Sequence, residues 1–138
     1  MASVITQSVT AVTKDFKEIK FACTAHTDGT FTAVDTDGYI TKMIRGWFLY
    51  KFSVVIGATA PTAASDMTLK DPKGVDLLGG QGTDKITGAI ASTLENYPKI
   101  NDQAANQPVM GALTLAITNN SVSAAVFDVY CIFKRANA

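Results

Sequence analysis

The chain has 138 residues, a length that suits one folded domain able to bury about two thirds of its unfolded surface. Twelve Lys and Arg residues balance twelve Asp and Glu residues, so the formal net charge is zero and the positive footprint of a nucleic-acid-binding protein is missing. Charged residues make up only 17% of the chain, against about 25% in an average soluble domain. We therefore expect no nucleic-acid partner and a surface that other subunits partly cover.

The N-terminal stretch MASVITQSVTAVTKDF has neither a basic region nor an apolar run of signal-peptide length. Nowhere do about 18 apolar residues follow one another, so we expect no membrane partner. Within this stretch SVITQSVTAV alternates and carries no charge. Two interpretations stay open: it adds a strand to a neighbouring subunit, with Val4 and Ile5 as interface candidates, or it is the first strand of its own sheet.

The next stretch, KEIKFACTA, has a period of two that is typical of a strand with one solvated face. Its core face consists of Ile19, Phe21, Cys23 and Ala25. Cys23 and Cys131 both fall inside apolar strand patterns, which favours buried free thiols over a disulfide. Two Asp-Gly pairs follow, Asp28-Gly29 and Asp37-Gly38, and predict hairpin turns in a meander of short antiparallel strands.

The strongest strand pattern is RGWFLYKFSVVIG, a core strand. Its apolar face is predicted to hold Phe48, Tyr50, Phe52, Val54 and Ile56. Trp47 and Leu49 fall on the opposite, mixed face. The last strand, AVFDVYCIFK, follows VMGALTLAIT and NNSVSA as a predicted hairpin and turns Tyr130 and Ile132 outward.

If these two strands are neighbours, the outward residues form an aromatic-centred patch that is a candidate subunit interface. Its members are Trp47, Leu49, Tyr130 and Ile132. The alternative is that a helix or loop of the same chain, such as the segment 84–97, covers the patch. That segment spaces Ile86, Ile90 and Leu94 as a helix would, yet Gly88 and the β-branched threonines favour an ordered loop, so both readings stay open.

The stretch SDMTLKDPKGVDLLGG gathers Asp66, Asp71 and Asp76 around a turn. A calcium loop needs roughly six to eight oxygen ligands and commonly a distal Glu, whereas DPKGVD has a Lys where another ligand would help and no Glu follows it in this stretch. Asp71-Pro72-Lys73-Gly74 instead has the residue order of a β-turn inside a short hairpin. We therefore predict that the carboxylates turn the chain, and no metal site.

No arrangement of residues suits catalysis. The single histidine, His26, lies just before a tight turn, and no serine lies in a nucleophile elbow. The glycines of GGQGTDK lack the spacing of a phosphate-binding loop, and Glu18 and Glu95 are the only glutamates. We expect neither an enzyme nor a cofactor.

Short strand patterns separated by Gly, Asn, Asp and Pro turns run through the chain without a repeat or linker. They predict an all-β fold with one domain over residues 1–138. The expected architecture is a two-sheet antiparallel β-sandwich, jelly-roll-like, with about eight strands and at most one short helix near residues 84–97.

The stretches TAPTAASDMTLKDPKGVDLLGG and PVMGALTLAITNNSVSAAVFDVYCIF resemble a pattern of small virion structural proteins of tailed bacteriophages. The resemblance covers about residues 45–134. It implies a β-sandwich present in many copies on a phage particle, as head decoration or head-fibre base, or as a tail or connector component. Where such proteins have a glycine before the final strand, this chain has Ala124 and Ala125.

The resulting hypothesis is a non-enzymatic virion protein that forms homo-oligomers and contacts other virion proteins such as capsid, fibre or tail subunits. Free thiols and the missing signal sequence suit assembly in the cytoplasm of the bacterial host. The competing hypothesis is a lectin-like carbohydrate-binding module, in which an exposed Trp47 or Tyr39 stacks on a sugar.

Overall fold

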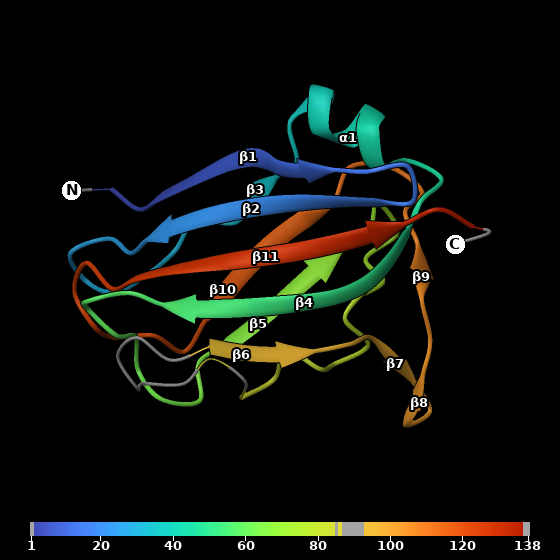
Figure 1. Ribbon diagram of the computed structural model, residues 1–138. Coiled ribbons are helices and arrows are strands. Elements are labelled where there is room, and N and C mark those ends of the chain that lie inside the picture. Colours follow the sequence, from blue (N-terminus) through green and yellow to red (C-terminus); the bar gives the residue numbers. More distant parts are fainter. Residues whose placement is uncertain (1, 85, 87–92, 137–138) are drawn as a thin grey trace.

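The structure is a computed structural model that describes residues 2–84, 86 and 93–136. These residues form two layers of antiparallel strands with one short helix, which confirms the predicted all-β sandwich (Figure 1). In chain order the elements are β1 (Val4–Val12), β2 (Phe16–Thr24), β3 (Val34–Asp35), α1 (Gly38–Ile44), β4 (Phe48–Ile56), β5 (Asp66–Lys70), β6 (Thr93–Asn96), β7 (Lys99–Ile100), β8 (Gln103–Ala104), β9 (Gln107–Pro108), β10 (Thr114–Thr118) and β11 (Val126–Lys134). The strands outnumber the expected eight because β3, β7, β8 and β9 have only two residues each.

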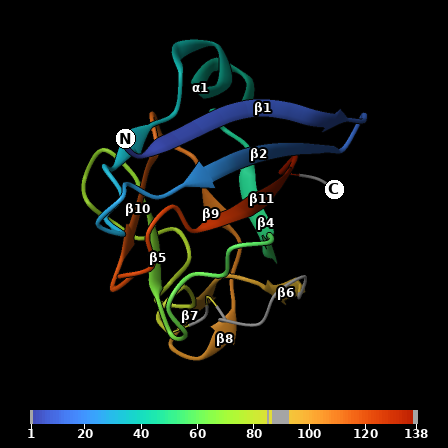
Figure 2. The ribbon, with the colours of Figure 1, turned by 90° about the vertical axis from the view of Figure 1, so that its left-hand side faces the viewer.

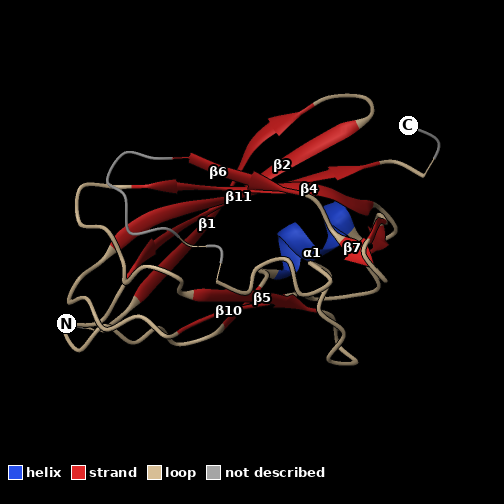
Figure 3. Cartoon of the chain, turned by 90° about the horizontal axis from the view of Figure 1, so that it is seen from below, coloured by secondary structure: helices blue, strands red, loops and turns tan. Residues whose placement is uncertain are grey.

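The larger sheet has the order β1-β2-β11-β4-β6, with β9 also paired to β4. The smaller sheet has the order β3-β10-β5, and β7 pairs with β8 as a separate hairpin. The two sheets lie face to face, as Figure 2 and Figure 3 show from two directions. Phe-rich inner faces of β2, β4 and β11 pack against the inner faces of β5 and β10 in one buried cluster.

From β2 to β6, and again from β9 to β11, consecutive strands alternate between the two sheets, which is the connectivity of a jelly roll. Two of the predicted hairpins are therefore wrong because the strands that they would join lie in different sheets: β10 and β11 are in different sheets, and the Asp28-Gly29 turn leads from β2 across to β3. The side chain of Asn120 ties these crossing loops together, because its amide donates to the carbonyl of Gly29 at 2.7 Å and accepts from the amide of Thr62 at 2.8 Å. Turn residues in the sequence indicate where the chain bends, but not which sheet it enters next.

The helix also lies elsewhere than the sequence predicted. Asp37-Gly38 begins α1 instead of a hairpin, and Ile40 and Ile44, one helical turn apart, are both buried. Figure 3 shows α1 at the level between the two layers, where these side chains join the core. In the segment 84–97, Thr93–Asn96 form strand β6 instead of a helix, and residues 85 and 87–92 lie outside the described part.

The turn before β11 has a glycine-type backbone conformation, although this chain has alanines where the phage pattern has a glycine. Ala124 has a φ of 53°, in the left-handed region that glycine occupies without strain. Its amide still donates to the carbonyl of His26 at 3.2 Å, and Ala125 is fully buried. The chain therefore keeps the glycine-type turn although it lacks the glycine.

Candidate functional site

The Asp71 turn has the geometry that the sequence predicted. The Asp71 carbonyl accepts the amide of Gly74 at 2.9 Å, and Gly74 has a φ of 85°. One carboxylate oxygen of Asp71 also accepts the amides of Lys73 and Val75, at 2.9 and 3.0 Å. This is a β-turn closed by an Asp side chain, and the prediction of a turn is confirmed.

The other two carboxylates in this region bind N–H groups as well. Asp76 accepts three backbone amides, from Leu69 at 3.0 Å, Leu78 at 3.1 Å and Gly80 at 3.1 Å. Asp66 accepts the amide of Asp84 and the side-chain amide of Asn119. Their lone pairs therefore organise the loop, and no group of three or more possible metal ligands occurs among the described residues.

The single histidine and the two cysteines also serve the fold. Nδ1 of the His26 ring lies 2.9 Å from a carboxylate oxygen of Asp28 at the surface. Hydrogen bonds from the hydroxyl and the amide of Thr30, together with His26, lower the pKa of the Asp28 carboxyl to about 2. Cys23 and Cys131 are buried and free, as predicted, and burial raises the pKa of Cys131 to about 12 and that of Cys23 further above its ordinary range.

The outward face of the larger sheet carries the first candidate surface. We call this the outer face and define it by Phe16, Tyr50, Val55, Tyr130 and Ile132. Phe16 and Tyr50 are exposed and their ring centroids lie 5.9 Å apart. Two pairs of opposite charge lie on the face: Lys20 with Asp128 at 3.7 Å, and Lys51 with Glu95, a bond that raises the pKa of Lys51. Lys134 lies on the same face with its amino group 5.4 Å from the ring centroid of Tyr50. The outer face thus combines apolar side chains with charges that are partly neutralised.

Tyr130 and Ile132 lie on this face as predicted, but Leu49 and Trp47 do not. Leu49 is fully buried in the core, because a β-bulge shifts the register of β4 against β11. Tyr50, which the alternation assigned to the core, is the extra residue of the bulge and turns outward. Trp47 is half-buried against the core, with the amino group of Lys17 at 4.1 Å from its ring centroid.

Strand β1 forms the second candidate surface. It pairs with β2 over its whole length, so it is a strand of its own sheet, while its other edge makes no backbone hydrogen bond to any described residue. Val4 points outward and is exposed, whereas Ile5 packs partly against the core. The only irregularity along the strand is a register shift at Thr10. We call the unpaired side of this strand the open edge of β1.

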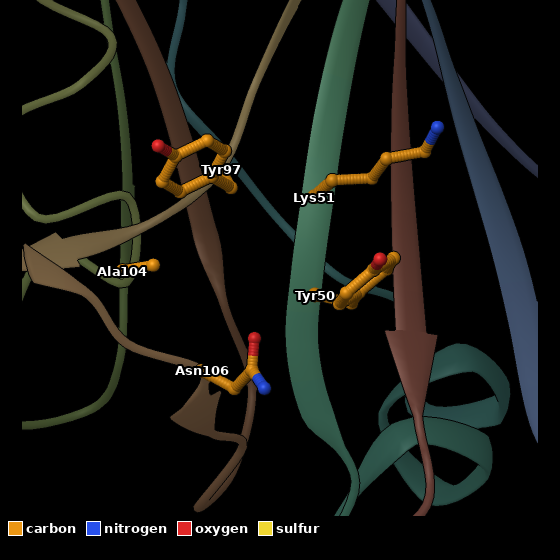
Figure 4. Close-up of a pocket in the computed structure, with 5 residues that line it drawn as sticks. All are labelled: Tyr50, Lys51, Tyr97, Ala104 and Asn106. Carbon is orange, nitrogen blue, oxygen red and sulfur yellow. The ribbon is translucent and has the colours of Figure 1, made fainter. Parts of the chain in front are cut away.

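A pocket of about 320 Å³ lies between β4 and the segment that follows β6 (Figure 4). It is lined by Tyr50, Lys51, Tyr97, Ala104 and Asn106. A second hollow of about 280 Å³ shares two of these side chains and continues past Glu95 and Asn96. This pocket could not be predicted from the sequence, since its lining comes from separate elements and the alternation places Tyr50 in the core.

None of the described helices is long and apolar enough to cross a membrane. Comparison with known proteins finds no matching family model and no matching curated protein. Among solved structures, a chain of the cyanophage Pam1 capsid asymmetric unit is 12% identical, with a TM-score of 0.45, over 95% of this chain and 86% of that one. A cupin domain from Bordetella pertussis Tohama I is 15% identical, with a TM-score of 0.33, over 99% of this chain and 98% of that one. Similarity at this level assigns neither a family nor a function.

Proposed function

We propose that this chain is a non-enzymatic structural protein of a phage particle, present in many copies and held there through the open edge of β1 and the outer face. The observation that carries the proposal is the open edge: nine residues, VITQSVTAV, without one charged residue or proline. The resemblance of residues 45–134 to small phage virion proteins supports a phage particle as the assembly.

An edge without charges or prolines is expected where another chain covers the strand in the assembled particle. Soluble proteins protect exposed edges with lysines, prolines, bulges or very short strands, because unpaired N–H and C=O groups otherwise recruit strands from other chains. Strand β1 has only the irregularity at Thr10. A partner strand that pairs with β1 would satisfy these backbone groups and extend the larger sheet across the subunit boundary.

The outer face suits close subunit packing. Aromatic side chains such as Tyr50 and Tyr130 supply contact area, and the paired charges limit repulsion between copies. The formal net charge of zero also favours close packing, because copies without net charge do not repel one another electrostatically. We assign the protein to the head, as a decoration or fibre-base protein whose partners are capsid or fibre subunits. A position in the tail or connector is the alternative.

The experiment is to quantify the chain by mass spectrometry in particles purified from its source culture. We expect a fixed, high copy number, and its absence from purified particles would overturn the proposal. The double substitution Thr6→Lys and Ser8→Lys tests the role of the open edge, because both side chains are exposed on β1. The matched control, Thr83→Lys with Ser123→Lys, adds the same charge at exposed loop positions. Loss of incorporation in the β1 variant alone supports the assigned surface, and equal incorporation of both variants rejects it.

A further inference from the structure

The pocket between β4 and residues 97–106 has two exposed aromatic walls. Tyr50 and Tyr97 keep 41% and 47% of their surface exposed, which is high for large side chains that bury well elsewhere in this fold. Figure 4 shows Tyr97, Ala104 and Asn106 on one side of β4, whereas the side chains of Tyr50 and Lys51 project from β4 on the side of β11. Exposed rings that flank one hollow are typical of a binding site rather than of random surface.

The wall formed by Tyr50 depends on the bulge in β4. Regular alternation from the buried Phe52 would turn Tyr50 into the core and Leu49 outward. The extra residue reverses both assignments: Leu49 is buried, and Tyr50 points outward with its ring centroid 5.9 Å from that of Phe16. Bulges often re-aim a side chain next to a functional site.

The opposite wall is held against the body of the protein. Asn101 and Asp102 both have positive φ values, 52° and 64°, and close the β7–β8 hairpin with a tight turn. The amide of Ala105 donates to the carbonyl of Pro98 at 3.0 Å and closes the base of the hairpin. Gly79 touches this hairpin so closely that a Cβ there would overlap the carbonyl oxygen of Lys99. The pocket is therefore preformed.

The polar groups of the lining indicate the chemistry of the ligand. In the described part of the chain, the amide of Asn106 and the hydroxyls of Tyr50 and Tyr97 have no hydrogen-bond partner. They can therefore donate to and accept from the hydroxyls of a ligand. Among the residues that line the pocket, Lys51 alone is charged, and it is paired with Glu95. Beside the lining, the amino groups of Lys99 and Lys134 lie over the rings of Tyr97 and Tyr50, at 5.6 and 5.4 Å from the ring centroids.

We propose that this pocket binds a neutral sugar ring of a glycan, with the C–H face of the ring on Tyr97 and its hydroxyls on Asn106 and the tyrosine hydroxyls. The negative face of an aromatic ring attracts C–H groups, and one side of a sugar ring presents such groups. The volume of about 320 Å³ is at the small end of the range for small-molecule sites, roughly 300–1,000 Å³. This inference does not depend on the role in a phage particle.

The test is saturation-transfer NMR of the intact chain with the methyl glycosides of glucose, galactose, mannose, fucose, N-acetylglucosamine and N-acetylgalactosamine. Glucuronic acid serves as a charged comparison. We expect transfer to at least one neutral glycoside, strongest at the C–H protons of one ring face. Tyr97→Ala should weaken the binding roughly tenfold. Asn106→Ala should also weaken it, and Tyr39→Ala, which removes an exposed tyrosine of α1 outside the pocket, should leave it unchanged.

Transfer to none of the six glycosides would overturn the proposal. So would binding that survives both Tyr97→Ala and Asn106→Ala, since the sugar would then lie elsewhere. Light scattering distinguishes a further occupant: a dimer that Tyr97→Ala dissociates would mean that a second copy of the chain fills the pocket, which also rejects the sugar. A thermal melt of each variant verifies that it is folded, and Asn106 is exposed enough for its replacement to leave the fold intact.

Discussion

Leu49 lies directly opposite Phe133 in the larger sheet, and both side chains are buried in the core. One step along β11, Ile132 lies opposite Lys51, so Tyr50 has no partner in that strand. Because of this one extra residue, Leu49 faces the core and Tyr50 faces outward. Both the outer face and the pocket depend on this bulge.

Leu49→Ala should therefore destabilise the protein by about 2–5 kcal/mol, because it leaves a cavity in a packed core. Tyr50→Ala, one residue further, should cost less than about 1 kcal/mol, since the ring is exposed and loses mainly its contact with Phe16. Urea unfolding of both variants measures the difference. The reverse order of the two effects would contradict the bulge.

Asp76→Ala should lower the free energy of unfolding by about 1–3 kcal/mol, because three backbone amides lose their acceptor. The control is Asp37→Ala, which removes the same charge from a carboxylate that caps no amide of α1. Neither calcium nor a chelator should shift the melting temperature of the wild-type protein. A rise in melting temperature with calcium would show that these carboxylates hold an ion.

Gly79→Ala should destabilise the protein more than Gly80→Ala does. Both glycines have positive φ values, 62° and 78°, so both substitutions carry the backbone strain of about 1–3 kcal/mol. Only at Gly79 would the new methyl group overlap the Lys99 carbonyl, whereas open space surrounds Gly80. Equal melting temperatures of the two variants would mean that the β7–β8 hairpin does not lie where the structure places it.

Ala124→Gly should stabilise the protein by about 0.5–1 kcal/mol, because relief of the left-handed strain exceeds the entropy that glycine adds to the unfolded chain. Ala125→Gly should act in the opposite direction, since it removes a buried methyl group and adds the same entropy. Thermal unfolding of the pair measures the two signs. Destabilisation by Ala124→Gly would contradict the φ of that residue.

Features that depend on neighbouring residues could be predicted from the sequence. The core faces of β2 and β11 follow the alternation, so Phe21 and Phe133 are buried as expected. The Asp71 turn and the free thiols were also predicted correctly. In each case the determining contacts lie within a few residues, or follow from burial alone.

Features that depend on contacts distant in sequence could not be predicted. The bulge in β4 appears only when the strand pairs with β11, and it reversed the assignments of Leu49 and Tyr50. The crossings between sheets depend on Asn120, which joins loops 91 and 58 residues away. Helix α1 was not predicted because its seven residues are too few for a clear helical periodicity. The Asp-Gly pair at its start is a strong local signal for a hairpin.

Hydrogen exchange of the β1 amides, measured in the isolated chain and in assembled particles, tests the central claim most directly. In an antiparallel edge strand alternate N–H groups point away from the sheet, so about half of the amides of Val4–Val12 should exchange fast in the isolated chain. We predict that these amides become protected on the particle, while those of the central strand β11 are protected in both states. Fast exchange of the same β1 amides on the particle would contradict assembly through the open edge.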